Sequence, residues 1–192
     1  AEHCPGSVIF FARDNLHHPV LATHHAQHKR VIYLQGQHIV ASGENGEHKI
    51  ALKNIPLTQD GSIYFQIENA MAAIGAAWAL GFDWKVIREG LSSFISDSQT
   101  APGRFNLFNY RNATLIADYG HNPDAIQALV SAIDNIPSKK RSVVISAAGD
   151  RRDEDIRLQT RIIGDAFDKV VLYQDQCQRG RADGEVISLL RE

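Results

Sequence analysis

The stretch ATLIADYGHNP, residues 113–123, decides the fold of this chain. Its apolar first half predicts a strand that ends at Asp118, and Pro123 predicts the first turn of a helix. The same alternation recurs twice, with strands at 142–146 and 170–173 and helices at 155–167 and 183–192. Apolar strands joined by helical crossovers predict a parallel sheet covered on both faces, so the fold class is α/β and the second half is Rossmann-like.

The first half of the chain has a different pattern. Short β-like runs, which we expect to pair mainly antiparallel, lie at 7–11, 30–34, 38–41 and 48–52. A helix over 67–80 follows; it is apolar almost all round, which predicts that it is buried. Asp83 is the expected N-cap of the next helix. Because the polar segment 96–103 is typical of a linker, we expect two parts, residues 1–99 and 100–192.

Composition excludes several classes of protein. The 192 residues are 44% apolar, enough for a core, and their formal net charge of −2 gives no basic field to hold nucleic acid or an anionic membrane. Two cysteines are too few for a disulfide framework, and no apolar run reaches the length of a membrane span. We therefore expect a cytoplasmic protein. Residues 1–5 contain no Met, and the last helical pattern stops without a cap, so we also expect a piece of a larger protein.

Polar residues gather where the three predicted strands of the second half end. In parallel α/β folds, ligands bind beyond the carboxyl ends of the strands. The first end offers an acid and a histidine, the second a run of charge, and the third an acid and two arginines; the residues concerned are Asp118, His121, Asp150, Arg151, Asp175, Arg179 and Arg181. Each loop alone is equally consistent with a capped helix entry, a solvated charge run or a surface turn.

Four motifs in order along the chain resemble those of the Mur ligases and folylpolyglutamate synthetases. They are residues 61–73 with an amide three positions before an asparagine, PGRF at 102–105, DYGHNP at 118–123 and GDRRD at 149–153. Within that superfamily, FQIEN at 65–69, AWALG at 77–81 and AAGDRRDEDI at 147–156 are similar to the cyanophycin synthetase family. The resemblance implies the C-terminal part of a central, ATP-binding domain (residues 1–99), followed by a C-terminal domain truncated at its end (residues 100–192).

The resemblance also implies a reaction. ATP converts an aspartate side-chain carboxylate into an acyl phosphate, and arginine attacks it to form an isopeptide bond. By the family pattern Gln66 and Asn69 contact adenine, Arg104 contacts the nucleotide, Asp118 accepts from the ribose, and His121 is catalytic near the transferred phosphate. The candidates for substrate binding are Asp150, Arg151, Asp175, Arg179 and Arg181.

The implied partners are ATP, Mg²⁺, arginine and a growing poly-aspartate (cyanophycin) chain, in a parent that is a homo-oligomer. No phosphate-binding Gly-x-x-x-x-Gly-Lys-Ser/Thr sequence occurs in the chain, so ATP and Mg²⁺ are expected to be held mainly by parts outside it. The fragment alone is therefore expected to be inactive.

Two other functions remain open. The chain could be a scaffold module of a homologue that polymerises β-aspartyl-arginine units, or a non-catalytic binding or oligomerisation domain. The histidines between 17 and 28 could also suit a metal, but they lack paired cysteines or acids at ligand spacing, and we expect a solvated loop there and no metal site.

Overall fold

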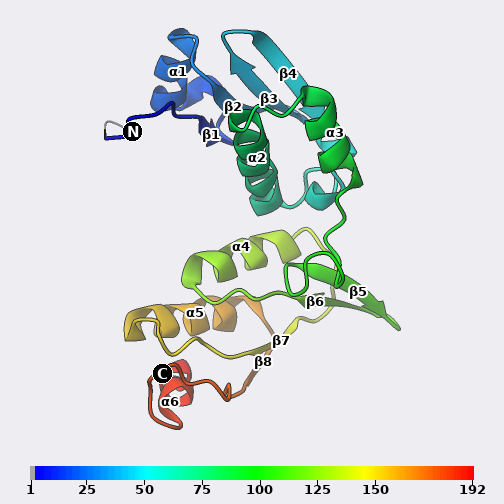
Figure 1. Cartoon of the computed structure of the whole chain (residues 1–192). Coiled ribbons are helices and arrows are strands. Elements are labelled where there is room, and N and C mark those ends of the chain that lie inside the picture. The colour runs from blue at the N-terminus through cyan, green and yellow to red at the C-terminus, as the bar shows by residue number, and fades with distance from the viewer. Residues whose placement is uncertain (1–2) are drawn as a thin grey trace. The chain divides into compact units, whose positions relative to one another are not determined.

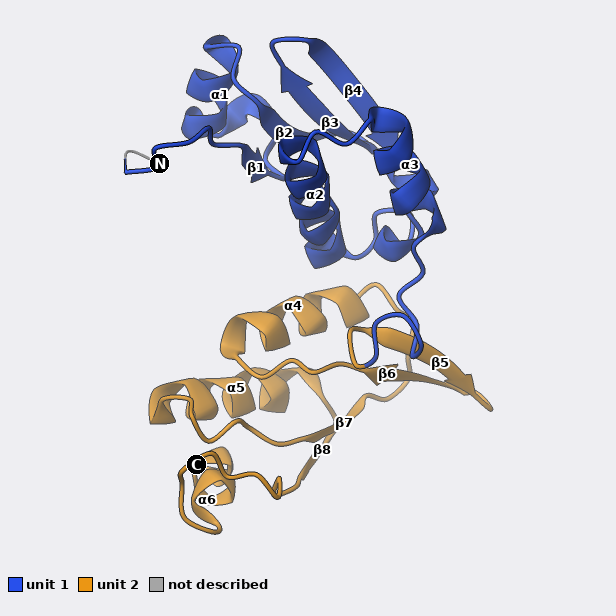
Figure 2. Cartoon of the chain, viewed as in Figure 1, with its two compact units in different colours: residues 1–102 blue, residues 103–192 orange. Residues whose placement is uncertain are grey.

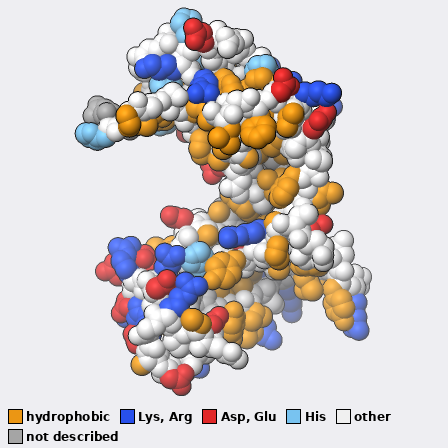
Figure 3. All heavy atoms as spheres, in the orientation of Figure 1, with side chains coloured by type: hydrophobic (Ala, Val, Ile, Leu, Met, Phe, Trp, Pro, Cys, Tyr) orange, Lys and Arg blue, Asp and Glu red, His pale blue; other side chains and the backbone are white. Residues whose placement is uncertain are grey.

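The computed structural model describes residues 3–192 and divides into two compact units, residues 1–102 (unit 1) and residues 103–192 (unit 2) (Figures 1 and 2). The division falls inside the polar segment 96–103. Each unit has its own sheet structure and its own buried apolar clusters. In the space-filling view, acidic and basic side chains are intermixed on the visible face of unit 2, and hydrophobic side chains are visible on both units (Figure 3).

Unit 1 is built on a four-stranded sheet. The strands are β1 (Phe10–Ala12), β2 (Val31–Gln35), β3 (His38–Gly43) and β4 (Gly46–Ala51), in that spatial order. β1 pairs with β2 in parallel, and the other neighbours are antiparallel. Gly36 and Gly46 take positive φ values of 57° and 102° in the hairpin turns, which glycine adopts without steric cost. The expected antiparallel strands are therefore present.

The histidine-rich segment is a helix and not the solvated loop that we expected. It forms a 3-10 turn, η1 (Asn15–His17), and then α1 (Pro19–Ala26). His24 Nε2 donates to the carbonyl of Val8 at 3.0 Å, and His25 Nε2 lies 3.0 Å from Ser42 Oγ, so both rings tie the helix to neighbouring segments. Within residues 3–192, no three histidine, cysteine or acidic side chains come close enough together to hold a metal ion.

Two helices cover one face of the sheet of unit 1, and Leu21 of α1 packs on the other face. After two 3-10 turns, η2 (Leu52–Asn54) and η3 (Pro56–Thr58), come α2 (Tyr64–Ala79) and α3 (Trp84–Ser93). The core side chains of this unit include Ile32, Ile39, Leu52, Ile67, Met71 and Ile74. The prediction that α2 is buried is half right. Its Ile67 and Met71 face is buried, whereas Ala72 and Ala76 on the other face are exposed.

The N-cap of α3 gives a first testable prediction. Asp83 Oδ1 accepts from Lys85 N at 2.7 Å, which confirms the expected cap. Asp83→Ala leaves that backbone donor without its partner and should destabilise unit 1 by about 1 kcal/mol, whereas Asp83→Asn keeps an acceptor and should cost much less. Thermal unfolding of the two variants checks this; equal melting temperatures for Asp83→Ala and the wild type would show that the cap contributes nothing.

Unit 2 alternates strands and helices as expected. It comprises β5 (Asn106–Tyr110), β6 (Ala113–Ala117), α4 (Pro123–Ile133), β7 (Ser142–Ile145), α5 (Asp153–Ala166), β8 (Lys169–Leu172) and α6 (Glu185–Arg191). β7 and β8 pair in parallel. Ile126 of α4, Ile145 of β7 and Ile163 of α5 form a shared apolar cluster, which fixes both helices on the parallel strands.

Two details of the predicted parallel sheet are wrong. The first predicted strand, now β6, pairs antiparallel with β5, a strand that we did not predict. A two-residue turn, Arg111–Asn112, joins them, and Arg111 has a positive φ of 54°, as tight hairpins require. The sheet is also covered on one face only: alternate residues point to opposite faces, and Val144 (68%) and Val171 (39%) are exposed.

Among residues 3–192, none of the helices combines the length and the apolar character that crossing a bilayer requires.

Candidate functional site

The loop after β6 is held in shape by one carboxylate. Asp118 Oδ1 accepts from Gly120 N at 2.6 Å, and Oδ2 accepts from Phe105 N at 2.8 Å. Tyr119 N donates to the carbonyl of Gly103 at 2.8 Å. These bonds join the start of unit 2 to the end of β6 and bring the Arg104 guanidinium to 5.9 Å from the centre of the Tyr119 ring.

The Asp118 carboxylate can still accept hydrogen bonds from a ligand. Its side chain is exposed, and each carboxylate oxygen has a second lone pair beyond the one used by the backbone. Two such acceptors suit the two adjacent hydroxyl groups of a ribose. The predicted role is therefore compatible with the geometry, although the same carboxylate also has a structural role.

His121 lies in the same loop, next to the start of α4. Its Nδ1 is 3.2 Å from the carbonyl of Tyr119, and the two rings are 5.2 Å apart. A carbonyl only accepts, so Nδ1 is the donor in this contact, and Nε2 makes no hydrogen bond within the described residues 3–192. Asn122 caps α4 by accepting from Ala125 N at 2.8 Å, and Pro123 occupies the first turn. The half-buried imidazole can thus act as a proton acceptor, or as a donor to an anion once it is protonated.

One arginine connects all three strand ends of unit 2. Arg179, after β8, donates through Nη1 to Asp150 Oδ2 at 3.1 Å and through Nη2 to the Tyr119 hydroxyl at 2.9 Å. Asp150 follows β7, and Tyr119 follows β6. The hydrogen bond and positive charge of Arg179 lower the pKa of the Asp150 carboxyl, which is therefore ionised at neutral pH. The structure thus brings Asp150 and Arg179 together beside the Asp118 loop.

Arg181, two residues further along the chain, makes a different set of contacts. Its Nε donates to the carbonyl of Gly149 at 2.6 Å, and its Nη2 donates to the carbonyl of Arg151 at 2.7 Å and lies 2.8 Å from Asp153. Its Nη1 donates to Glu185 at 2.7 Å. The side chain is only 16% exposed. Arg181 therefore fastens the third loop to the second, and few of its donors remain for the substrate contact that we predicted.

The remaining two candidates of unit 2 are Arg151 and Asp175. The buried Nε of Arg151 has no hydrogen-bond partner in the described part of the chain. Asp175 is exposed, with Oδ1 accepting from Cys177 N at 2.8 Å. Asp175 is thus an acid that a ligand can reach, whereas the unsatisfied Nε of Arg151 is buried.

The amide pair belongs to unit 1 and lies near the start of α2. Asn69 Nδ2 donates to Gln66 Oε1 at 2.9 Å, and Gln66 is only 5% exposed. This bond orients the exposed amide of Asn69, and within residues 3–192 its oxygen and second N–H have no hydrogen-bond partner. An acceptor beside a donor is what the edge of adenine requires, since that edge offers an amino group and a ring nitrogen. Asn69 therefore fits the predicted contact with adenine, whereas the buried Gln66 orients the Asn69 amide.

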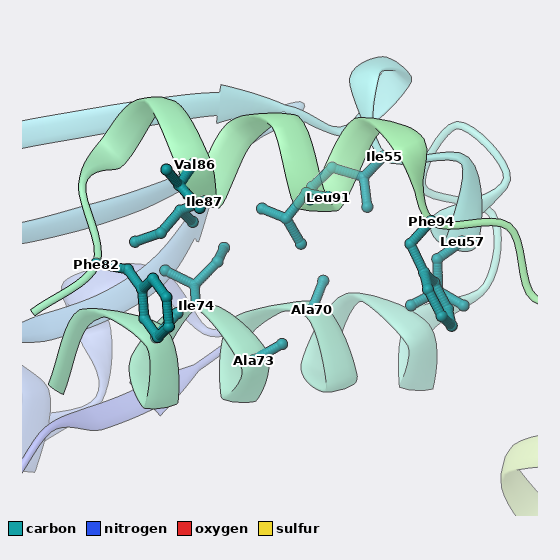
Figure 4. A pocket seen from close by; sticks show the side chains of 12 residues that line it. Ile55, Leu57, Ala70, Ala73, Ile74, Phe82, Val86, Ile87, Leu91 and Phe94 are labelled. Atoms are coloured by element: carbon teal, nitrogen blue, oxygen red, sulfur yellow. The ribbon is translucent and has the colours of Figure 1, made fainter. Parts of the chain in front are cut away.

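An apolar groove lies elsewhere in unit 1, between α2 and α3 (Figure 4). Its volume is about 400 Å³, and its walls include Ile74 and Ala77 of α2, Leu91 of α3 and the flanking Phe82 and Phe94. None of the lining residues carries a charged or hydrogen-bonding side chain, so the groove offers no group for catalysis.

Tyr119 was not among the candidate site residues predicted from the sequence. Its hydroxyl accepts from Arg179 and its ring lies beside His121 and Arg104, so it is the central contact of the cluster. The feature of the sequence that could have identified Tyr119 as a site residue is its position inside the DYGHNP motif.

Comparisons with known proteins show which family and fold the chain resembles. The family described as Mur ligase, glutamate ligase domain matches residues 103–191. These residues are therefore similar to the Mur ligase family. The resemblance inferred from the motifs is thereby confirmed, and unit 2, which holds the matched residues, is labelled the Mur ligase domain below.

Curated relatives extend the similarity through unit 1. The chain is 33% identical to a cyanophycin synthetase of Geminocystis herdmanii over 99% of its own length and 22% of that protein, and 32% identical to one from a Nostoc species over 99% and 21%. The chain therefore spans about a fifth of the length of these relatives.

Solved structures show the same fold. E. coli FolC in complex with ADP aligns with a TM-score of 0.58 at 21% identity, over 91% of this chain and 41% of that one. MurF from Acinetobacter baumannii aligns with a TM-score of 0.57 at 19% identity, over 88% and 39%. The predicted α/β fold class is confirmed.

Proposed function

We propose that this chain is part of an ATP-dependent ligase that forms amide bonds, of the cyanophycin synthetase type. The observation that carries the proposal is the similarity to cyanophycin synthetases over 99% of the chain, which includes both units and not the Mur ligase domain alone. In this proposal residues 1–99 are the C-terminal part of the ATP-binding domain and residues 100–192 are the C-terminal domain.

Three side chains would hold the nucleotide. Asn69, oriented by Gln66, would hydrogen-bond the adenine edge. Asp118 would accept from the ribose hydroxyls, and Arg104 would contact the nucleotide from the segment that Asp118 braces. Bound ATP would supply the phosphoryl group that turns an aspartate side-chain carboxylate into an acyl phosphate open to attack by an amine.

The chain's own residues would hold the other reactants. His121, with Nε2 able to exchange a proton, would serve at the transferred phosphate or at the attacking amine. An incoming arginine needs an acid for its guanidinium and a cation for its carboxylate. Asp150 and Asp175 supply acids, and Arg179 and Arg151 supply cations.

The test uses the full-length protein with ATP, Mg²⁺, labelled arginine and a poly-aspartate primer. We expect ATP-dependent incorporation of arginine into the primer. The chain of 192 residues alone should incorporate none, because its sequence has no phosphate-binding loop for the triphosphate.

A parallel reaction with β-aspartyl-arginine separates the proposal from the scaffold alternative. Growth of polymer from the dipeptide, with no incorporation of free arginine, would contradict the proposed reaction. No turnover of ATP under either condition would contradict the assignment as a ligase.

A further inference from the structure

Tyr119 combines exposure with an unused hydrogen-bond donor. Its side chain is 52% exposed, and its hydroxyl oxygen accepts from Arg179 Nη2 at 2.9 Å. A tyrosine hydroxyl also carries one proton to donate. In the part of the chain that the structure describes, no acceptor receives that proton. The O–H group is therefore available to a ligand.

Arg179 presents further donors beside that hydroxyl. A guanidinium has five N–H groups, and the contacts with Asp150 and Tyr119 occupy two of them. The side chain is 38% exposed. Arg179 also has a φ of 49°, a left-handed backbone that costs a non-glycine residue energy, so the surrounding loops hold it in place. An O–H and several N–H donors are thus fixed side by side at the surface.

Such a pair of donors matches a carboxylate, which accepts through two oxygens and forms its strongest bonds with charged donors. The neighbouring Asp150 disfavours a doubly charged phosphate at the same place, because the two anions repel. It does not disfavour a zwitterion, whose positive group can approach Asp150 while its carboxylate lies against Arg179.

We propose that the Tyr119 hydroxyl and the Arg179 guanidinium together bind the α-carboxylate of the incoming amino acid. This rests on the proposed function, and it assigns to Tyr119 a direct contact with substrate. Tyr119→Phe is the variant of choice, because it removes only the hydroxyl and keeps the ring contacts with His121 and Arg104.

The experiment measures calorimetric binding to the full-length protein in the presence of a non-hydrolysable ATP analogue. The two ligands are arginine and argininamide, which lacks the carboxylate. We expect Tyr119→Phe to weaken binding of arginine about tenfold and to leave binding of argininamide unchanged. Tyr110→Phe is the matched control, since Tyr110 is a comparably exposed tyrosine (57%) of β5, and it should change neither.

Each other outcome overturns the proposal in a recognisable way. Equal weakening of both ligands would mean that Tyr119 only supports the loop. Unchanged arginine binding with weaker binding of the ATP analogue would mean that the two donors serve a phosphate. If the wild-type protein binds arginine and Tyr119→Phe binds it equally well, this inference fails and the proposed function stands. If wild-type protein neither binds nor incorporates arginine, both fail.

Discussion

Gly149→Ala is expected to destabilise the Mur ligase domain by about 3 kcal/mol or more, because the added methyl group overlaps backbone atoms. A Cβ at this position would lie 2.0 Å from the carbonyl oxygen of Gln178 and 3.0 Å from its carbonyl carbon. Backbone cannot rotate aside as a side chain can, so the loop after β8 must move. Movement of that loop also breaks the 2.6 Å bond from Arg181 Nε to the Gly149 carbonyl. Calorimetry should show the transition of this domain lowered by about 10 °C or more.

Gly164→Ala is the matched control. Gly164 lies within α5, and a Cβ there meets no atom within 4 Å. Because alanine favours the helix over glycine, this variant should be more stable than the wild type by up to about 1 kcal/mol. A Gly149→Ala protein as stable as the wild type would show that the two loops are not packed as described.

Asp118→Ala is expected to raise the KM for ATP of the full-length protein about ten- to a hundredfold. The variant removes both carboxylate acceptors that we assign to the ribose, and hydrogen bonds to charged groups contribute about 1.5–3 kcal/mol each. It also removes the partner of Phe105 N and Gly120 N, so the loop itself loosens. Steady-state kinetics with ATP and arginine varied separately measures the effect on each substrate.

Two comparisons make the result specific. Asp124→Ala removes an exposed acid from the first turn of α4, six residues away, and should leave the KM for ATP unchanged. Asp118→Asn keeps one acceptor oxygen and should lie between the wild type and Asp118→Ala. Unchanged ATP kinetics in Asp118→Ala would remove Asp118 from the nucleotide site and leave it the role of loop brace.

The fold of the second half could be predicted well because apolar strands and amphipathic helices alternate there. β5 was missed because its sequence, NLFNY, mixes polar and apolar residues, and its pairing with β6 depends on a two-residue turn. α1 was missed because its histidines look like a polar loop, although Pro19 marks a helix start. The exposure of one face of α2 could not be predicted, because alanine is compatible with either environment.

The three loops of the site could be identified from the sequence. Which of their side chains hold the loops together and which keep donors for a ligand could not. Arg179 and Arg181 flank the same glycine and appear equivalent. Only the structure shows that Arg181 is bonded to two backbone carbonyls and two carboxylates, whereas Arg179 keeps free donors beside Tyr119. The need for glycine at position 149 is likewise invisible in sequence, because it arises from a loop nearly thirty residues away.

The central proposal is that Asn69 contacts the adenine of a bound nucleotide and Asp118 contacts its ribose. A crystal structure of the full-length protein with ADP tests it most directly. The account predicts Asn69 within hydrogen-bond distance of the adenine edge and Asp118 within hydrogen-bond distance of the ribose hydroxyls of the same ADP molecule. An ADP molecule that contacts only one of these side chains, or neither, would contradict it.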